Sequence, residues 1–552
     1  MKKSLPITLI FCLLILCPGQ IQTKSLNHKK DQIPEIFDLR NVSGKNYVTY
    51  VRHQRGGTCW THGAMAAIEG NLMITGVWEE AGEPGEPDLA EYHLDWWNGF
   101  NKYYNEDIKP KSGGLDVHYG GDYRVTSAYT SRGEGPVRNI DAQLFDSPPP
   151  RDDPIYHHFY IPDIEWYTVG DSLQGIDIIK TKIMEYGVMG TCMYSNSEYL
   201  DNIQYTHYQP LNSPFDPNHA IAIVGWNDTL TTQAPQPGAW LCKNSWGVGF
   251  GLGGFFWISY YDKHCTRNPE MGAISFQDVE PLQYSTIYYH DYHGWRETKA
   301  DCFEGFNCFT TESKEYLSAV SFFTAADSIY YLVKIYDKYE DQKLKNLLST
   351  KTGNIDHQGF HTVSLDTVVE LMNNDDFYIY LYLSHGGHPY DCTSDVPVLL
   401  GASDTGTIVE STANPRESYF RQNEQWYDFT DFNPTGNLCI KGLTVQKQDS
   451  GVITVKSGIP STFKLLQNFP NPFNNNTFIK YTLSQSTRVN VTIYDITGRK
   501  VITLVDKTEQ AGEKCISWDG KNTAGADVSS GVYIYSLKTD NDFFSKRMVL
   551  IR

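Results

Sequence analysis

The sequence predicts an α+β domain followed by two all-β regions, on the basis of hydrophobic patterning in three stretches. Residues 33–280 mix helix-like segments with short apolar runs typical of strands, and this mixture favours an α+β domain. Residues 282–448 alternate strand-like runs with turn residues, as in a β-sandwich. In residues 456–552 apolar and polar residues alternate between turns, and we therefore expect a small all-β module there.

The composition indicates a folded chain and limits the classes of partner. Of the 552 residues, 40% are hydrophobic and 20% are charged, which is typical of globular domains. The formal net charge is −19, whereas a surface that binds nucleic acid needs a basic patch. We therefore expect no nucleic-acid partner.

The N-terminus predicts export. Lys2 and Lys3 form a positively charged start, and Leu5 to Leu16 form an apolar core that is too short to span a bilayer. These features indicate a signal peptide over residues 1–23. No later run reaches the ~20 apolar residues of a membrane helix, so we expect no transmembrane segment.

Export also changes how the cysteines are interpreted. Two of the 11 cysteines lie in the signal segment, and the odd number that follows leaves at least one unpaired. Cys302 with Cys308, and Cys392 with Cys439, are candidate disulfides. No pair of C-x-x-C elements occurs, so we expect no structural zinc, and nothing in the sequence predicts a cofactor.

One cysteine lies in a setting that suits catalysis. In "QRGGTCWTHG", Cys59 follows a glycine turn, and Ala64, Ile68 and Leu72 recur at helical spacing after it. This pattern predicts an amphipathic helix with Cys59 in its first turn. A helix N-terminus stabilises a thiolate, the nucleophilic form. A buried structural cysteine is the alternative that this segment alone leaves open.

Two distant segments offer the partners that a nucleophilic cysteine needs. "PNHAIAIVGW" places His219 at the start of an apolar strand, and "WLCKNSWGVGFGLGGFFWIS" places Asn244 in a glycine-rich turn between strands. A Cys–His pair requires a third group that orients the imidazole, and an Asn carboxamide can do so. The long separation along the chain suits residues on opposite lobes of a cleft.

These three segments, from residue 33 to residue 276, resemble the signature blocks of papain-like cysteine peptidases. The resemblance implies a papain-like two-lobed catalytic domain. It implies Cys59 as the nucleophile, His219 as general base and then acid, and Asn244 as the group that orients His219. Gln54 would complete the oxyanion hole with the backbone N–H of Cys59.

The same resemblance suggests residues that hold substrate. "HYGGDY" is similar to the glycine pair that hydrogen-bonds substrate backbone in this family, so Gly120 and Gly121 are candidate subsite residues. Trp246 is expected to shield the His219–Asn244 hydrogen bond from water, with a plain core tryptophan as the alternative.

The sequence also departs from the family's pattern. Gln54 is five residues before Cys59 instead of six, and the usual cysteine between them is absent. His62 occupies a position where an aromatic is common, and we interpret it as a packing or cleft-wall residue. Little room is left between the signal and the domain for an inhibitory propeptide. Latency is therefore expected to come from elsewhere, for example the acidic segment "EEAGEPGEPD" or the following β-domain.

Both C-terminal regions also resemble known families. Residues 282–448, with "YYHDYHGW", resemble the lectin-like domain that follows papain-like domains in some bacterial proteins, which implies a glycan site or a scaffold. Residues 456–552, with "QNFPNPFNNNT" and "VTIYDITGRKV", are similar to the C-terminal sorting domain of the type IX secretion system of Bacteroidota. That resemblance implies export across the outer membrane.

The main hypothesis is a secreted cysteine endopeptidase that acts on polypeptides through a thioester acyl-enzyme. The alternative is an adhesion or glycan-binding protein with a catalytically silent papain fold. A third hypothesis is that the same three residues catalyse acyl transfer from one amine to another.

Overall fold

The computed structural model describes residues 33–109, 113–402 and 406–446. In the C-terminal region it describes 464–465, 468, 471–474, 477–483, 486–509, 512–539 and 543–551. The predicted signal peptide and nearly all of the segment between the second and third regions lie outside these residues. Within them, no helix is long and apolar enough to cross a bilayer.

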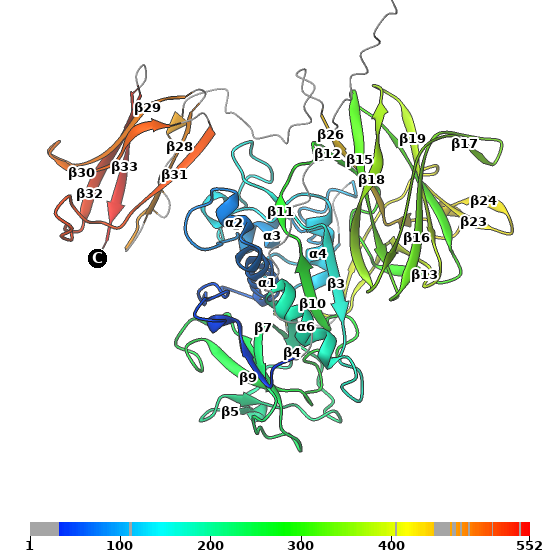
Figure 1. The fold of residues 1–552 in the computed structure, drawn as a ribbon, viewed down its shortest axis with the longest axis horizontal. Coiled ribbons are helices and arrows are strands. Elements are labelled where there is room, and N and C mark those ends of the chain that lie inside the picture. Colours follow the sequence, from blue (N-terminus) through cyan, green and yellow to red (C-terminus); the bar gives the residue numbers. More distant parts are fainter. Residues whose placement is uncertain are drawn as a thin grey trace, which may run out of the picture.

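The first region has the expected α+β character. Its helices are α1 (Cys59–Thr75), α2 (Val77–Glu80), α3 (Glu91–Trp97), α4 (Tyr123–Ser131), α5 (Asn139–Ala142) and α6 (Ile176–Tyr186). Its strands are β1 (Ile36–Asp38), β2 (Phe159–Tyr160), β3 (Asp163–Tyr167), β4 (Met189–Met193), β5 (Leu200–Asp201), β6 (Thr206–His207), β7 (His219–Asn227), β8 (Ala239–Lys243), β9 (Phe255–Ser259), β10 (Ala273–Gln277) and β11 (Glu280–Pro281). Figure 1 shows α1 to α4 grouped together while α6 lies beside β10.

Helix α1 is the central helix of the first region, and nearly all of it is buried. The helix begins at Cys59, which confirms the predicted position, but all but two of its 17 residues are buried, so the predicted amphipathic character is wrong. Close packing on β7 explains part of this burial. A Cβ on Gly63 would lie 2.5 Å from the Tyr123 hydroxyl, which itself donates to the Ile221 carbonyl at 3.1 Å. Only glycine permits this approach of helix to sheet.

The second region is all-β, as predicted. Its strands are β12 (Thr286–Tyr288), β13 (Glu297–Lys299), β14 (Glu304–Thr310), β15 (Glu315–Thr324), β16 (Ile329–Glu340), β17 (Lys343–Ile355), β18 (Gly359–Leu371), β19 (Asp376–Leu383), β20 (His388–Asp391), β21 (Ser394–Val396), β22 (Thr407–Val409), β23 (Ser418–Gln422), β24 (Gln425–Asp428), β25 (Asn437–Leu438) and β26 (Ile440–Val445). One sheet has the order β17-β16-β19-β14-β23-β24. It packs on the sheet containing β15, β18 and β26 through a common apolar core.

The first and second regions share one continuous sheet. Its strand order is β12-β26-β15-β18-β3-β10-β4-β7-β8-β9-β6-β5, so β18 of the second region pairs with β3 of the first. The pairing is antiparallel and joins Phe360 to Ile164 and His361 to Asp163. Phe323, Phe360 and Leu443 lie in the same apolar cluster as helix α1. The two regions are therefore joined by backbone hydrogen bonds as well as by side-chain packing.

The cysteine pairings expected from the sequence are wrong. Cys302, Cys308, Cys392 and Cys439 are all free thiols. Three of these four side chains are buried in the β-sandwich, where a thiol packs as a small apolar group. Apolar packing and strand pairing, and not these disulfides, hold the region together.

The third region is a small all-β module with its own core. Its strands are β27 (Lys464–Leu465), β28 (Thr477–Leu483), β29 (Thr487–Asp495), β30 (Lys500–Glu509), β31 (Gly512–Trp518), β32 (Gly531–Lys538) and β33 (Phe543–Leu550). They form the sheets β27-β28-β31 and β30-β29-β32-β33. Val489, Val491 and Ile493 are fully buried between these sheets, as their alternation along β29 predicts.

Candidate active site

Cys59 is the first residue of α1 and is completely buried. Its Sγ accepts a hydrogen bond from the backbone N–H of Ala220, at 3.4 Å, on β7. Burial raises the pKa of Cys59 to about 12, and the N–H of Ala220 offsets this only in part. The helix N-terminus was expected to favour the thiolate, but desolvation has the larger effect on the pKa of Cys59.

His219 is the first residue of β7, and Asn244 follows the end of β8. The sheet brings the two side chains together, with His219 Nε2 2.8 Å from Asn244 Oδ1. The Trp246 ring stacks on the imidazole with ring centroids 4.6 Å apart. Burial lowers the pKa of His219 to about 4, although the bond to Asn244 opposes that shift. Thiol and imidazole are therefore both neutral in this state.

Gln54 lies against the turn that carries Asn244. Its backbone N–H donates to the Ser245 carbonyl at 2.8 Å, and its side-chain Oε1 accepts from the Ser245 hydroxyl at 2.6 Å. Its Nε2 donates to the Gly56 carbonyl at 2.9 Å. The shortened loop thus keeps Gln54 beside the site, but its amide N–H is engaged within its own loop.

Gly120 and Gly121 lie just before α4 and beside the loop that precedes Cys59. The N–H of Gly120 donates to the Gly57 carbonyl at 3.1 Å. A Cβ on Gly121 would lie 2.5 Å from the Trp60 ring, so only glycine lets the backbone run this close to the helix. Both glycines therefore lie close to the N-terminal end of α1, which begins at Cys59.

His62 is buried on α1, in keeping with its interpretation as a packing residue. Its Nδ1 lies 2.9 Å from the Thr58 carbonyl, and its Nε2 lies 3.9 Å from Glu91 Oε1. Burial lowers its pKa. Its two ring nitrogens are thus directed to Thr58 and Glu91.

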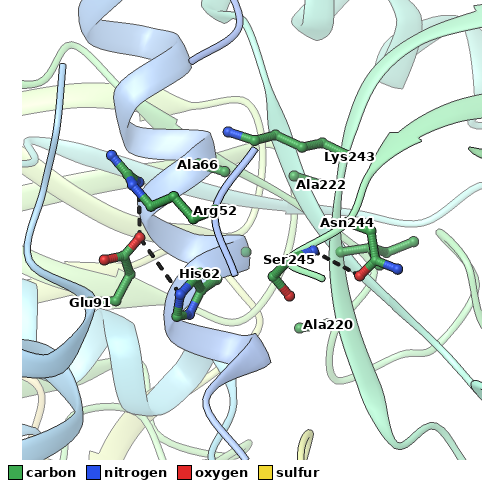
Figure 2. A pocket seen from close by; sticks show the side chains of 11 residues that line it. Arg52, His62, Ala66, Glu91, Ala220, Ala222, Lys243, Asn244 and Ser245 are labelled. Atoms are coloured by element: carbon green, nitrogen blue, oxygen red, sulfur yellow. Dashed lines mark hydrogen bonds and ion pairs between the residues drawn. The ribbon is translucent and has the colours of Figure 1, made fainter. Parts of the chain in front are cut away.

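A buried charge cluster beside the site had no signal in the sequence. Arg52 contacts Glu69 on α1 at 2.7 Å and Glu91 on α3 at 2.8 Å, and it also pairs with Asp88. Burial alone would lower the pKa of Arg52, but these carboxylates hold it well above its usual value. Figure 2 shows Arg52, Glu91 and His62 on one side of a small cavity and Asn244 with Ser245 on the other.

This cluster connects the helical side of the cleft to the Asn244 turn. The Arg52 carbonyl accepts from the N–H of Gly247 at 2.9 Å, one residue beyond Trp246. Lys243 Nζ, directly before Asn244, donates to Thr49 Oγ1 at 2.9 Å, and that hydroxyl donates to Glu69 at 2.6 Å. Arg52 thus joins the turn, through one backbone hydrogen bond, to the carboxylates on α1 and α3.

Comparisons with known proteins relate this region to a family and to a fold. The family described as papain family cysteine protease matches residues 170–274, a range that contains His219 and Asn244. The crystal structure of the cysteine protease and lectin-like domains of Cwp84, a surface layer associated protein of Clostridium difficile, superposes with a TM-score of 0.58. It is 22% identical and covers 74% of this chain and 88% of its own. The first region is a papain-like cysteine peptidase domain.

The following regions match two further families. The lectin like domain family matches residues 287–444, and the FlgD Ig-like domain family matches residues 475–542. The papain-like domain is therefore followed by a lectin-like all-β region, the same order as in the Cwp84 structure.

Curated relatives match parts of the chain. Cathepsin J of Rattus norvegicus is 26% identical over 264 residues, which are 46% of this chain and 68% of the relative. Cysteine proteinase 1 of Entamoeba histolytica is 24% identical over 231 residues, 41% of this chain and 63% of the relative. The chain spans only 11% of the length of serine-repeat antigen protein 5 of Plasmodium falciparum, to which it is 26% identical.

Proposed function

We propose that the protein is a secreted cysteine endopeptidase whose nucleophile is Cys59. The observation that carries the proposal is the 2.8 Å contact between His219 Nε2 and Asn244 Oδ1. The Cys59 thiol lies close by, because its Sγ accepts from the backbone N–H of Ala220, the residue after His219. Because the Asn oxygen can only accept, Nε2 must carry a proton and Nδ1 is left as the basic nitrogen. This is the tautomer that a general base for Cys59 requires.

The reaction follows from these roles. His219 Nδ1 takes the thiol proton as Cys59 Sγ attacks the peptide carbonyl, and the same proton then passes to the departing amine. A thioester is left on Cys59. Water attacks it with His219 again acting as base, which releases the acid and restores the thiol. Both the backbone N–H of Cys59 and the Gln54 amide would stabilise the oxyanion, once Gln54 turns from Gly56.

The substrate is expected to lie along the wall formed by Gly120 and Gly121, with Trp246 keeping water from the imidazole. Gly120 borders the Cys59 loop through its bond to Gly57, and the Trp246 ring covers one face of His219. An extended peptide can pair with backbone at such a glycine edge, as in other strand additions.

Cys59→Ser tests this function, with Cys192→Ser as the matched control. Both thiols are fully buried and free, but Cys192 lies on β4 outside the proposed triad. Cys59→Ser should abolish hydrolysis of a denatured protein and labelling by an epoxide thiol inhibitor, and Cys192→Ser should retain both. Gln54→Ala should lower kcat by about 10²–10³-fold. Hydrolysis that persists in Cys59→Ser would contradict the proposal.

Export and surface attachment belong to the same proposal. The signal over residues 1–23 and the type IX sorting module over residues 456–552 would carry the peptidase (33–280) and lectin-like domain (282–448) across the outer membrane. The independent core of the third region supports this division. Deleting residues 456–552 should retain the protein in the periplasm, as fractionation would reveal. Secretion of the truncated chain would contradict this assignment.

Glycan binding by the lectin-like domain is the second candidate function. The match to the lectin like domain family over residues 287–444 supports it. A glycan array probed with Cys59→Ser protein would test binding without proteolysis. If sugar binds and no variant with an intact Cys59 hydrolyses protein, the chain is an adhesin with a silent peptidase fold.

A further inference from the structure

A loop of the lectin-like domain lies against the segments that directly precede Cys59 and His219. Strands β21 and β22 form a hairpin that pairs Ser394 with Val409 and Val396 with Thr407. The loop between them carries Val398, Leu399 and Leu400 into the apolar cluster that contains helix α1. Leu400 is fully buried.

The loop makes the backbone contacts of a bound peptide. Leu400 and Gly121 form an isolated antiparallel β-bridge, with Leu400 N–H donating to the Gly121 carbonyl at 2.9 Å and Gly121 N–H donating to the Leu400 carbonyl at 3.4 Å. The N–H of Gly401 then donates to the Asn218 carbonyl at 2.8 Å, one residue before His219. The loop is thus bonded to both walls of the cleft, as an added strand would be.

The fit next to the nucleophile loop requires glycine. A Cβ on Gly401 would lie 2.3 Å from the Gly57 carbonyl oxygen, and a Cβ on Gly57 would lie 2.2 Å from the Gly401 oxygen. Gly401 also has a φ of +97°, a conformation that other residues rarely adopt. Ala402 packs on Gly120, where a Cβ would lie 3.0 Å from the alanine methyl.

Residues 399–402 of the loop form a tight turn beside the segment that precedes Cys59. Ala402 N–H donates to the Leu399 carbonyl at 3.5 Å, which closes a β-turn with Gly401 at its third position. The Gly401 carbonyl lies against Gly57, and the Gln54 amide donates to Gly56 instead. The Gln54 amide therefore does not donate to the Gly401 carbonyl, so the proposed oxyanion hole does not polarise this carbonyl for attack.

The hairpin is held in place from its far side. Asn105 Nδ2 donates to the Glu410 carbonyl at 2.8 Å, and both the N–H and the hydroxyl of Thr412 donate to Asp107, at 2.7 and 2.8 Å. These bonds join the segment after β22 to the helical side of the cleft. The loop is thus a docked element of the fold.

We propose that residues 397–402 are a built-in competitive inhibitor that keeps the peptidase latent by filling the subsites on the N-terminal side of the scissile bond. This rests on the proposed peptidase function and adds its regulation. The loop binds as a peptide does at Gly121 and Asn218 and escapes cleavage because it turns back at Gly401. Substrate must displace it, so activity requires that the hairpin loop leave the cleft.

Gly401→Ala in the full chain tests the proposal, with Gly406→Ala as its matched control. Both glycines belong to the same loop and have positive φ, +97° and +72°. A Cβ clashes with Gly57 only at position 401, and it meets nothing within 4 Å at position 406. Both variants carry similar backbone strain, so only Gly401→Ala should expel the loop. Leu400→Asp, which places a charge in the apolar cluster, is the second variant.

Two readouts separate the inhibitor from the peptidase. Iodoacetamide alkylation of Cys59, mapped by mass spectrometry, reports access to the cleft, and hydrolysis of a denatured protein reports activity. Gly401→Ala and Leu400→Asp should raise the alkylation rate at least tenfold over wild type and Gly406→Ala. Equal rates in all four folded proteins would overturn the loop's role. Faster alkylation with no hydrolysis would support the loop and contradict the peptidase function.

A synthetic peptide with the sequence PVLLGA gives an independent measurement. It should inhibit hydrolysis by the Leu400→Asp variant competitively, and a peptide with proline in place of its second leucine should not. Proline lacks the N–H that Leu400 donates to Gly121. Equal inhibition by both peptides would contradict binding through this backbone bond.

Discussion

The two β-regions that follow the peptidase domain relate to it in opposite ways. The lectin-like region continues the peptidase sheet through the pairing of β18 with β3 and shares its apolar cluster. The C-terminal module has a separate core, and among the described residues none of its strands pairs with strands of the other regions. Two all-β regions of one chain can therefore differ in kind: the lectin-like region extends the sheet of the peptidase domain, whereas the C-terminal module folds around its own core.

Truncation should show this difference most strongly. A chain that ends at residue 446 should keep the thermal stability and hydrolysis of the full protein. A chain that ends at residue 281 should be insoluble, because it exposes the hydrogen-bonding edge of β3 and the apolar surface around Ile164. Soluble yield and circular dichroism measure both. A soluble, cooperatively folded short chain would show that the shared sheet is dispensable.

Single core substitutions give the next largest effects. Phe360 on β18 and Trp518 on β31 are both almost completely buried, and truncation to alanine should cost about 3–5 kcal/mol at each. Phe360→Ala should lower the unfolding temperature of peptidase and lectin-like regions together. Trp518→Ala should affect only the C-terminal module. Calorimetry resolves the unfolding transitions. An unshifted peptidase transition in Phe360→Ala would show that the two regions unfold independently, which contradicts the prediction.

Acid should also distinguish the regions. Burial lowers the pKa of His93, His219 and His388 from 6.5 to about 4, so the unfolded chain binds more protons between these values. The stability that these neutral histidines contribute to the folded state is complete above pH 6.5 and is lost as the pH falls through 4. The loss in the free energy of unfolding is at most about 3 kcal/mol per histidine. His388→Gln should flatten the dependence of the unfolding temperature on pH in this window.

The C-terminal module contains no histidine. The Thr497 hydroxyl and neighbouring N–H groups lower the pKa of Asp495 to about 2. The contribution of Asp495 to the stability of the module is therefore present above pH 4 and is lost only as the pH falls through 2. An unfolding temperature of the module that falls between pH 6.5 and 4 would contradict this contrast.

The smallest effect is expected at an exposed ion pair of the module. Arg488 Nη2 lies 3.1 Å from Asp506 Oδ1, with both side chains about half exposed or more. Arg488→Ala should change the free energy of unfolding of the module by less than about 1 kcal/mol. It should leave the peptidase transition unmoved. A larger change, measured by denaturant titration, would show that this surface pair stabilises the module more than exposed pairs usually do.

Local patterns predicted the elements that carry the proposed triad. A glycine turn before an apolar run places Cys59 at a helix start, and an apolar run after His219 places that residue at a strand start. Burial could not be predicted in the same way. The burial of nearly all of α1 involves an apolar cluster that also contains residues of β7 and Leu400, which lies some 340 residues after Cys59.

The remaining surprises are also contacts between distant segments. Nothing around Arg52 marks it as the partner of Glu69 and Glu91, since the three residues meet only after α1 and α3 have packed. The pairing of Leu400 with Gly121 likewise joins residues that lie far apart in the sequence. Sequence motifs identify residues with a local role, whereas these contacts are set by topology.

The three-residue pairing of β18 with β3 also constrains how such a chain can change over evolutionary time. A recombination event at residue 281 would fall at the boundary between the first and second regions in the sequence, yet it would break the sheet that β18 and β3 join. Any replacement domain would have to bring an edge strand in the register that joins Phe360 to Ile164. The peptidase and lectin-like parts are therefore expected to be inherited as one unit, while the C-terminal module can be exchanged freely.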